Sequence, residues 1–470
     1  MQNLHLSCYY LDKRCYDKYA LTEDILMENA SLGMANYIKT HFSKESSVLI
    51  VAGFGNNGAD GIVLARHLFG FCAVSLYLPL GVKSDMAKLQ LERVEKMGVS
   101  IVDELKEADI IVDCLFGAGL SRALDEQSRS LIEEINAMSG FKLSCDIPSG
   151  IDEEGNASPV AFEADVTITM GALSESLYTD MSKDFVGEVI CVDLGVSREA
   201  YEMDSDTYLL ENSDMVLPSR IRRNTHKGSY GHLSVIAGER EGASILSSMA
   251  SLRFGVGLVT LVGEIETPLP FEIMQNKTLP HNTSAIALGM GFGSDWSRVD
   301  EVLNSSLPII LDADIFHHSI IEKFLHQRDR TIVLTPHPKE FVSLFIRVFK
   351  RHLDIPLDIE NLQKHRLYYV REFTKLYPHI TLLLKGSNTI IAQNQKCFIN
   401  PLGTAKLSKG GSGDVLSGLI GGLLAQGYSG LEATIQASLA LTVGAEAYRG
   451  SSYAMIATDL IEEIGRLERE

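Results

Sequence analysis

Short apolar runs alternate with amphipathic segments through the first half of the chain. The runs that read as strands are Ser47–Ala52, Phe71–Leu78, Asp109–Cys114, Lys142–Asp146, Val166–Met170 and Val189–Val192. Between them lie segments with apolar positions at helical spacing: a helix that Thr22 caps, a helix ending at Phe69, and helices near Asp85–Met97 and Asp125–Met138. Strands that alternate with helices are typical of a parallel sheet covered by helices, so we expect a doubly wound α/β domain.

The second half repeats this pattern after a polar, acidic stretch, Ser197–Asp214. We expect strand Gly231–Ala237, helix Ala243–Phe254, strand Leu258–Val262 and a closing helix Ala457–Arg466. The runs Ile309–Asp312, Thr331–Thr335 and Ile380–Leu384 are continuously apolar, as expected for strands buried on both faces of a sheet. The pattern therefore predicts two doubly wound, three-layer α/β domains, residues 1–210 and 211–470.

Composition narrows the class of protein. The 470 residues are 45% hydrophobic and 22% charged, as in ordinary globular domains. Residues 1–210 hold 16 Lys and Arg against 34 Asp and Glu, which is a net charge of −18 out of −19 for the chain. This balance argues against nucleic-acid binding.

Cysteine usage and hydropathy bear on location. The seven cysteines include no Cys-x-x-Cys pair, so we expect reduced thiols and a cytoplasmic protein. We expect no secretory signal and no membrane span, because Arg253 interrupts the candidate run Gly242–Gly263.

A glycine-rich segment, Thr404–Asp414, reads T-A-K-L-S-K-G-G-S-G-D and leads into an apolar helix predicted at Val415–Gln426. Glycines let backbone N–H groups converge, and the helix dipole points its positive end at the same place, so the segment predicts an anion cradle. A carboxylate beside a phosphate site repels the ligand, so Asp414 is expected to take a proton from a hydroxyl that attacks a phosphoryl group. The alternative is a glycine-rich turn that Asp414 merely caps.

A second glycine loop, G-F-G-N-N-G-A-D-G, follows the strand Ser47–Ala52 and contains the spacing GxGxxG. In dinucleotide-binding dehydrogenases an acidic residue about 20 positions later binds the ribose, but here that place reads Tyr-Leu-Pro at 77–79. An NAD-dependent dehydrogenase is therefore disfavoured. Asn56, Asn57 and Asp60 in the loop suit a polar ligand or a cation.

Polar residues also follow the next strands, at the edge where open α/β sheets bind ligands. Asp113 precedes F-G-A-G-L, and Asp146 lies in C-D-I-P-S-G-I-D with Ser149 close behind. Each alone reads as a turn residue. As a set on one sheet edge, they predict a site.

In this order the motifs G-x-G-N-N-G-x-D-G, D-x-x-F-G-x-G and D-I-P-S-G-I-D resemble the NAD(P)H-hydrate epimerases, over roughly residues 10–205. The resemblance implies a Rossmann-like domain in which Asp146 contacts the reacting ring and acts as the catalytic group. It implies potassium at Asn57, Asp113 and Ser149. The hydrate would be held by Asn56, Asn57, Gly58, Ala59, Asp60, Gly117, Ala118, Gly119, Leu120, Ser121, Arg122, Ala123 and Asp146. Ala59 stands where the family usually has Gly.

The second half carries further motifs at strand ends. They are R-N-T-H-K-G-S-Y-G at 223–231, G-M-G-F-G at 289–293, D-A-D at 312–314, T-P-H-P at 335–338 and K-G-S-N-T at 385–389. His337 between two prolines reads equally as a rigid turn. Asp312 and Asp314 read as strand-end caps or as groups that orient a metal with its phosphates.

Together with G-G-S-G-D, these motifs resemble the ribokinase-like superfamily, and within it the ADP/ATP-dependent NAD(P)H-hydrate dehydratases, over roughly residues 211–467. The resemblance implies that Gly291, His337 and Asp414 face the hydrate. The nucleotide would be held by Lys385, Gly386, Ser387, Asn388, Thr389, Thr404, Lys409, Gly410, Gly411, Ser412 and Gly413. The chain departs from the family pattern at Lys339, where Gly is usual, and at Ile315, where Ala is common.

The sequence therefore predicts a bifunctional enzyme that repairs hydrated NADH and NADPH. The first half would epimerise the hydrates at C6, and the second would dehydrate the S hydrate with ADP or ATP. We expect potassium and Mg²⁺ as cofactors and a homo-oligomer. Two alternatives stay open: a ribokinase-like vitamin or sugar kinase fused to a nucleotide-binding module, and a noncatalytic sensing or protein-binding role for the acidic first half.

Overall fold

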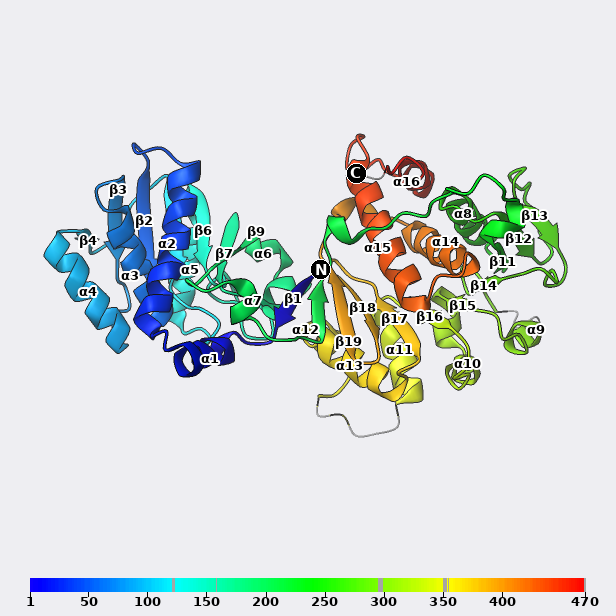
Figure 1. The fold of residues 1–470 in the computed structure, drawn as a ribbon, viewed down its shortest axis with the longest axis horizontal. Coiled ribbons are helices and arrows are strands. Elements are labelled where there is room, and N and C mark those ends of the chain that lie inside the picture. Colours follow the sequence, from blue (N-terminus) through cyan, green and yellow to red (C-terminus); the bar gives the residue numbers. More distant parts are fainter. Residues whose placement is uncertain (121–122, 158, 295–298, 350–352, 354, 469–470) are drawn as a thin grey trace. The chain divides into compact units, whose positions relative to one another are not determined.

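The computed structural model describes residues 1–120, 123–157, 159–294, 299–349, 353 and 355–468. The chain divides into two compact units (Figure 1). The N-terminal unit is Gln2–Thr207, and the C-terminal unit is Tyr208–Glu470 together with Met1. Strand β10 (Thr207–Leu209) contains the point of division.

The N-terminal unit has a seven-stranded, fully parallel sheet in the order β4-β3-β2-β5-β6-β7-β9. Its strands are β2 (Ser47–Ala52), β3 (Ala73–Tyr77), β4 (Ser100–Val102), β5 (Ile110–Cys114), β6 (Phe141–Cys145), β7 (Val166–Met170) and β9 (Glu188–Val192). The order reverses between β2 and β5, which is the switch point where such sheets bind ligands.

Helices cover both faces of this sheet. Val48 and Ile50 pack with α2 (Glu23–His41), α3 (Asn56–Leu68) and α4 (Asp85–Met97), whereas Leu49 and Val51 face α5 (Glu126–Ala137). The remaining elements are β1 (Gln2–His5), α1 (Tyr9–Tyr19), β8 (Leu173–Ser174), the 3₁₀ turn η1 (Glu175–Tyr178), α6 (Lys183–Val186) and α7 (Arg198–Tyr201). Continuous apolar strands therefore fold as predicted for a sheet buried on both faces.

In the C-terminal unit nine strands follow the order β13-β12-β11-β14-β15-β16-β17-β18-β19. They are β11 (His232–Ile236), β12 (Leu258–Val262), β13 (Met274–Asn276), β14 (Ala285–Leu288), β15 (Ile309–Leu311), β16 (Ile332–Leu334), β17 (Ile380–Leu384), β18 (Thr389–Gln393) and β19 (Lys396–Asn400). The strands up to β17 pair in parallel, and β17, β18 and β19 pair antiparallel. Both units thus have the predicted doubly wound α/β architecture.

Two layers of helices enclose this second sheet. One face packs against α8 (Glu241–Arg253), α14 (Ser412–Ala425), α15 (Gly430–Ala447) and α16 (Ala457–Ile464). The other packs against α9 (Val299–Leu303), α10 (Ile321–Leu325), α11 (Pro338–Val348), α12 (Ile359–Lys364) and α13 (Arg366–Leu376). Short 3₁₀ turns complete the unit: η2 (Asn212–Asp214), η3 (Lys227–Tyr230), η4 (Ala313–His317) and η5 (Ala405–Leu407).

The sequence prediction needs one correction. Helix α14 begins at Ser412, not at Val415, so the last residues of the glycine-rich segment form its first turn. The polar stretch Ser197–Asp214, predicted as the boundary between the domains, contains α7, β10 and η2. These elements are three or four residues long, which is too short for a periodic pattern to show.

Helices α8 and α14 approach closely because small residues face each other. The buried face of α8 carries several serines, and Gly418 of α14 lies so near that a Cβ there would be 2.1 Å from the carbonyl oxygen of Ser247. The hydroxyl of Ser247 also donates to the backbone carbonyl of Asp414, at 2.8 Å. This contact fixes the position of the amino end of α14.

Gly418→Ala should therefore destabilise the C-terminal unit. The added methyl group would force the two helices apart, and overpacking of this kind typically costs about 1–3 kcal/mol. Thermal unfolding followed by circular dichroism measures the loss. Gly242→Ala in α8 is the matched control, since nothing lies within 4 Å of a Cβ there. A Tm for Gly418→Ala equal to that of the control would contradict the close contact.

Candidate active sites

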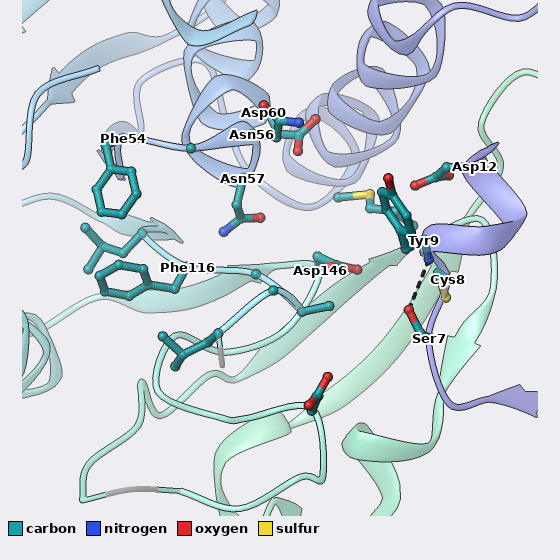
Figure 2. A pocket seen from close by; sticks show the side chains of 18 residues that line it. Ser7, Cys8, Tyr9, Asp12, Phe54, Asn56, Asn57, Asp60, Phe116 and Asp146 are labelled. Atoms are coloured by element: carbon teal, nitrogen blue, oxygen red, sulfur yellow. Dashed lines mark hydrogen bonds between the residues drawn. The ribbon is translucent and has the colours of Figure 1, made fainter. Parts of the chain in front are cut away.

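The N-terminal unit has a pocket of about 830 Å³ where β2, β5, β6 and β7 end (Figure 2). Its walls come from the loops after these strands, the first turn of α3 and the start of α1. The structure brings together here most residues of the predicted hydrate site. Those that line the pocket are Asn56, Asn57, Asp60, Gly117, Ala118, Gly119, Leu120 and Asp146.

Three other predicted residues of this site do not line this pocket. Gly58 and Ala59 are buried within α3, behind the pocket wall. Ala123 lines a smaller neighbouring pocket. Ser121 and Arg122 lie outside the described residues.

The glycine loop is tight because two of its residues touch backbone. A Cβ on Gly53 would lie 1.9 Å from the carbonyl oxygen of Leu115, and one on Gly58 would lie 1.8 Å from that of Gly53. Only glycine fits at both positions. The contacts place the first turn of α3 directly against the end of β5, so Asn57 and Asp60 reach the pocket.

Asp146 occupies the middle of the pocket in Figure 2, between Asn57 and Tyr9. It follows β6 with a left-handed φ of 67°, a conformation that non-glycine residues rarely adopt and that concentrates at functional sites. Burial raises the pKa of its carboxyl group, and hydrogen bonds from the Ala118 and Met170 backbones and the Thr169 hydroxyl partly offset the shift. The group is therefore held in place by donors while its proton affinity stays above that of an exposed Asp.

Beneath the pocket floor, Asp113 and Ser149 form one hydrogen-bonded unit. The Asp113 carboxylate accepts from the Ser149 hydroxyl at 2.6 Å, the Ser149 N–H at 2.8 Å and the Leu115 N–H at 3.1 Å. Burial raises the pKa of Asp113 to about 6, against the lowering effect of these bonds. Neither residue is part of the pocket lining.

Asn57 belongs to the same region. Its side-chain Nδ2 and Oδ1 are buried without a hydrogen-bond partner among the described residues, and a Cβ on Gly117 would lie 3.3 Å from Oδ1. Phe116, next to Gly117, donates its N–H to the Ser149 hydroxyl at 2.8 Å. The three residues predicted to bind potassium thus gather around Phe116 and Gly117, although no hydrogen bond joins Asn57 to Asp113 or Ser149 in the described chain.

Sequence reasoning missed the wall formed by Ser7, Cys8, Tyr9 and Asp12. Asp12 accepts from the hydroxyl of Tyr201 at 2.7 Å, and burial raises its pKa to about 6. The segment carries no motif and reaches the pocket only through the packing of α1 against α2 and α7, so no local signal marked it.

In the C-terminal unit, the charged residues Asp312, Lys385 and Asp414 converge at the amino end of α14. The ammonium group of Lys385 donates to Asp312 Oδ1 at 2.7 Å, and the Ser417 hydroxyl donates to Oδ2 at 2.6 Å. Asp312 is only 2% exposed, so these two donors compensate a buried carboxylate. A Cβ on Gly413 would lie 3.2 Å from Lys385 Nζ, which places the glycine cradle directly beside the lysine.

Asp414 lies in the first turn of α14, half-buried. Its pKa is raised to about 6, because burial and the negative charges of Asp312 and Asp314 together outweigh the lowering effect of Lys385. Gly411 precedes the helix with a φ of 96°, and Gly410 has nothing within 4 Å of a Cβ position. The segment therefore offers open backbone N–H groups next to a carboxylate that binds its proton more tightly than an exposed Asp.

The loop Gly289–Gly293 lies against Asp312 and Asp314. A Cβ on Gly289 would be 1.8 Å from the carbonyl oxygen of Asp312, and the Gly293 N–H donates to Asp314 Oδ2 at 2.8 Å. Gly291 is buried in the middle of this loop with a φ of 60°. Ile315, a departure from the family pattern, is fully buried in the core beside the loop.

His337 caps α11. Its Nδ1 accepts the N–H groups of Lys339 and Glu340, at 3.1 and 3.4 Å, and its Nε2 lies 3.2 Å from Glu340 Oε1. Burial lowers the pKa of His337, and the nearby Lys385 lowers it further. The imidazole thus has a structural role as the cap of α11. The neighbouring Lys339 is exposed.

Two further residues escaped sequence reasoning. Glu340 is buried, and its burial raises the pKa of its carboxyl group to about 7. Arg366, also buried, donates to the backbone carbonyls of Asn388 at 3.2 Å, Leu384 at 3.2 Å and Lys385 at 2.9 Å. Arg366 therefore stabilises the conformation of the predicted nucleotide loop Lys385–Thr389. It lies on α13, which carries no recognisable motif.

The remaining predicted nucleotide residues are spread along two loops. Thr389 begins β18 and bonds the carbonyl of Gly386 at 3.3 Å, so Gly386, Ser387 and Asn388 form a closed turn. Thr404 caps η5 by accepting the Lys406 N–H at 3.4 Å. Ser412 bonds the carbonyls of Leu407 and Lys409, and Lys409 bonds that of Tyr453.

Among the described residues, no helix is long and apolar enough to cross a membrane. The described residues also form no cluster of three or more His, Cys, Asp or Glu side chains that could hold a metal ion.

Comparison with known proteins gives matches to both units. A family model described as NAD(P)H-hydrate dehydratase matches residues 233–466, and one described as YjeF-related protein N-terminus matches residues 23–176. The bifunctional NAD(P)H-hydrate repair enzyme Nnr of Helicobacter pylori is 40% identical, over 97% of this chain and 98% of its own. The enzyme of the same name from Coxiella burnetii is 31% identical over 94% of both chains.

Among solved structures, the ADP/ATP-dependent NAD(P)H-hydrate dehydratase from Bacillus subtilis, co-crystallised with ATP and Mg²⁺, is 29% identical. It matches 53% of this chain and 92% of its own length with a TM-score of 0.46.

Proposed function

The chain belongs to the family of bifunctional NAD(P)H-hydrate repair enzymes, and we propose that its two units carry out successive steps of that repair. The N-terminal unit would interconvert the R and S hydrates of NADH and NADPH. The C-terminal unit would dehydrate the S hydrate with ADP or ATP. The similarity extends over nearly the whole chain, and it favours this function against two alternatives: a vitamin or sugar kinase, and a noncatalytic first half.

The first step concerns a carbinolamine, because water added across C5 and C6 leaves a hydroxyl on C6 beside the ring nitrogen. Loss of that hydroxyl gives an iminium-like ring, and addition of water to either face gives both epimers. Asp146 lies in the centre of the pocket with a raised pKa, so it would protonate the leaving hydroxyl and later accept a proton from the incoming water.

Potassium fits the region around Phe116 and Gly117. The buried, unpartnered Oδ1 of Asn57 and the oxygen-rich pair of Asp113 and Ser149 are the ligands that a hard cation prefers. These residues would hold the ion, and its charge would offset repulsion between the dinucleotide phosphates and the acidic unit.

The second step is a phosphoryl transfer. Asp414 would take the proton of the C6 hydroxyl, whose oxygen attacks the terminal phosphorus of ADP or ATP and releases AMP or ADP. Phosphate then leaves with the C–O bonding electrons as the ring nitrogen lone pair forms an iminium, and loss of a C5 proton restores NAD(P)H. The glycine cradle and Lys385 would stabilise the negative charge on the transferring group.

Magnesium would arrive with the nucleotide. Asp314, bonded to Gly293 through Oδ2, is the carboxylate best placed to hold it, since Lys385 and Ser417 already occupy Asp312. Bound Mg²⁺ supplies charge neutralisation for the phosphates.

The observation that carries the proposal is the convergence of Asp414, Lys385 and the glycine cradle at the amino end of α14. Incubation with mixed hydrate epimers and ADP or ATP tests it. Absorbance of reduced nicotinamide should return for the whole mixture, with one phosphate released per NAD(P)H formed. A phosphorylated product that accumulates without that absorbance would instead indicate a kinase.

None of the seven cysteines is paired in a disulfide, and we propose a cytoplasmic location. That the chain forms a homo-oligomer stays a prediction.

Asp414→Asn should abolish dehydration and leave ADP binding nearly unchanged, because the backbone cradle holds the phosphates without the carboxylate. Loss of a general base costs on the order of 10²–10⁴ in rate. In the unmodified enzyme the base form exists above the raised pKa, so kcat/KM should fall as pH decreases through about 6 and level off above it. Asp300→Asn, at an exposed position in the first turn of α9, is the control. Turnover above about a third of wild type for Asp414→Asn would exclude the assignment.

Asp146→Asn should stop epimerisation and spare dehydration of the S hydrate, because the two groups lie in separate units. With mixed epimers, absorbance should rise rapidly for the S fraction and then slowly at the spontaneous rate of R-to-S conversion. Glu153→Gln removes the same charge from the rim of the same pocket, so it separates proton transfer from simple charge repulsion. Disappearance of the R fraction at wild-type speed in Asp146→Asn would remove this residue from the mechanism.

Potassium should accelerate epimerisation and leave dehydration of pure S hydrate unchanged. Rates in potassium and in tetramethylammonium buffers of equal ionic strength measure the effect. Asn57→Ala should lose most of the potassium dependence, because it removes the unpartnered Oδ1. Equal epimerisation rates in both buffers would contradict the cation site.

A further inference from the structure

A second pocket, of about 260 Å³, adjoins the first one in the N-terminal unit. Phe54, Phe116 and Leu120 line both, so the two pockets meet at the rings of the two phenylalanines. These rings pack edge to face, with centroids 6.2 Å apart. Figure 2 shows them at the end of the large pocket away from Tyr9 and Asp12, with Asn57 and Asp146 between.

Lys83 lines this second pocket. Its N–H and that of Ser84 donate to the carbonyl of Phe54, at 2.9 and 3.1 Å, and its ammonium group lies 4.4 Å from the centroid of the Phe54 ring. Within the described parts of both linings it is the only side chain with a positive charge, and no ion pair engages it there. An exposed ammonium group, held beside an aromatic ring and free of carboxylates, is available to a ligand.

Lys83 lies in the loop that follows the second strand of the sheet, β3, where dinucleotide-binding domains recognise the ribose. In doubly wound dinucleotide-binding domains, the residue that reads the ribose follows the second strand: an acid bonds the 2′-hydroxyl, whereas a nearby basic residue accommodates a 2′-phosphate. Here the second strand is β3, and the loop after it, residues 78–84, contains Lys83 and no acid. The two hydrogen bonds to Phe54 tie this loop to the glycine loop.

The strand order places Asp146 and Lys83 on opposite sides of the switch point, where the two ends of a dinucleotide would bind. Asp146 follows β6, on one side of the junction between β2 and β5, and Lys83 follows β3 on the other. A ligand with its reacting ring at Asp146 would pass Gly117–Gly119 and reach Phe54 and Lys83 with its far end. The one acid of the second pocket lining, Asp125, accepts the Ser128 N–H at 2.8 Å as the cap of α5, so the helix amino end offsets its charge.

We propose that the second pocket holds the adenosine end of the hydrated dinucleotide and that Lys83 selects the hydrate that carries a ribose 2′-phosphate. This inference rests on the epimerase function proposed above. The adenine would contact the exposed parts of Phe54 and Phe116, and the 2′-phosphate would bind the ammonium group of Lys83. The first site would thus act on both hydrates but bind NADPH hydrate more tightly than NADH hydrate.

Lys83→Ala tests the selection. Without ADP or ATP only epimerisation proceeds, so R-to-S conversion is followed by chromatography with each hydrate separately. KM for NADPH hydrate should rise about tenfold, since a hydrogen bond to a charged group is lost, while kcat for it and both constants for NADH hydrate stay within twofold. Lys88→Ala is the matched control, because Lys88 is exposed on α4 and pairs with Asp85 at 3.3 Å.

Phe54→Leu should raise KM for both hydrates alike, because the adenine is common to them. An unchanged ratio of kcat/KM for the two hydrates in Lys83→Ala would overturn the selection by Lys83. If the wild-type protein epimerises neither hydrate, the proposed function fails. Binding of NADP⁺ against NAD⁺ to wild type and Lys83→Ala then decides the inference by itself, and an equal loss for both nucleotides would refute it.

Discussion

Both candidate sites depend on close backbone contacts that only glycine permits. In the N-terminal unit, Gly53 touches the carbonyl of Leu115 and Gly58 touches that of Gly53, so the first turn of α3 lies against the end of β5. In the C-terminal unit, Gly418 brings α14 onto α8, and Gly289 presses its loop onto Asp312. A methyl group at any of these positions would displace a helix terminus or loop by more than a hydrogen bond tolerates. The glycines therefore set the geometry of the polar groups, although they contribute no chemistry themselves.

The buried carboxylates fall into two groups, those that bond a cationic side chain and those that do not. Asp312 accepts hydrogen bonds from Lys385 and Ser417, so it positions the lysine. Asp146 and Asp414 have no cationic partner bonded to them in the described chain, and burial raises the pKa of each. An acid with a raised pKa is better suited to proton transfer than an exposed Asp. The contrast between Asp312 and Asp414, which share one site, separates a positioning role from a proton-transfer role.

The sequence predicted six strands of the first sheet and five of the second, because continuous apolar runs are local signals. It also predicted the helices α2, α3, α4, α5, α8, α14 and α16, but not the remaining helices or the short strands such as β1, β4, β8 and β10. In the structure Asp146 follows β6 and Asn57 lies in the first turn of α3, after β2, whereas the cradle before α14 follows the 3₁₀ turn η5. Whether Asp146 and Asp414 act on a hydrate stays a prediction. Tyr9, Asp12 and Arg366 could not be found in this way, since each reaches its site through packing between elements distant in the sequence. The start of α14 was misplaced because glycines weaken the helical signal in the first turn.

The acidity of the N-terminal unit poses a physical problem for an anionic ligand, and burial partly solves it. Desolvation raises the pKa of Asp12 to about 6 and the pKa values of Asp60 and Asp146 above the usual value. Repulsion from Asp146 contributes to the shifts of Asp12 and Asp60. All three carboxyl groups therefore bind a proton more tightly than an exposed Asp does. A dinucleotide phosphate nearby would favour the protonated forms further, whereas a cation at Asn57 would favour the ionised ones. Proton affinity, cation and ligand would thus be coupled at this site, because a bound dinucleotide phosphate would raise the pKa of Asp146 and a cation at Asn57 would lower it.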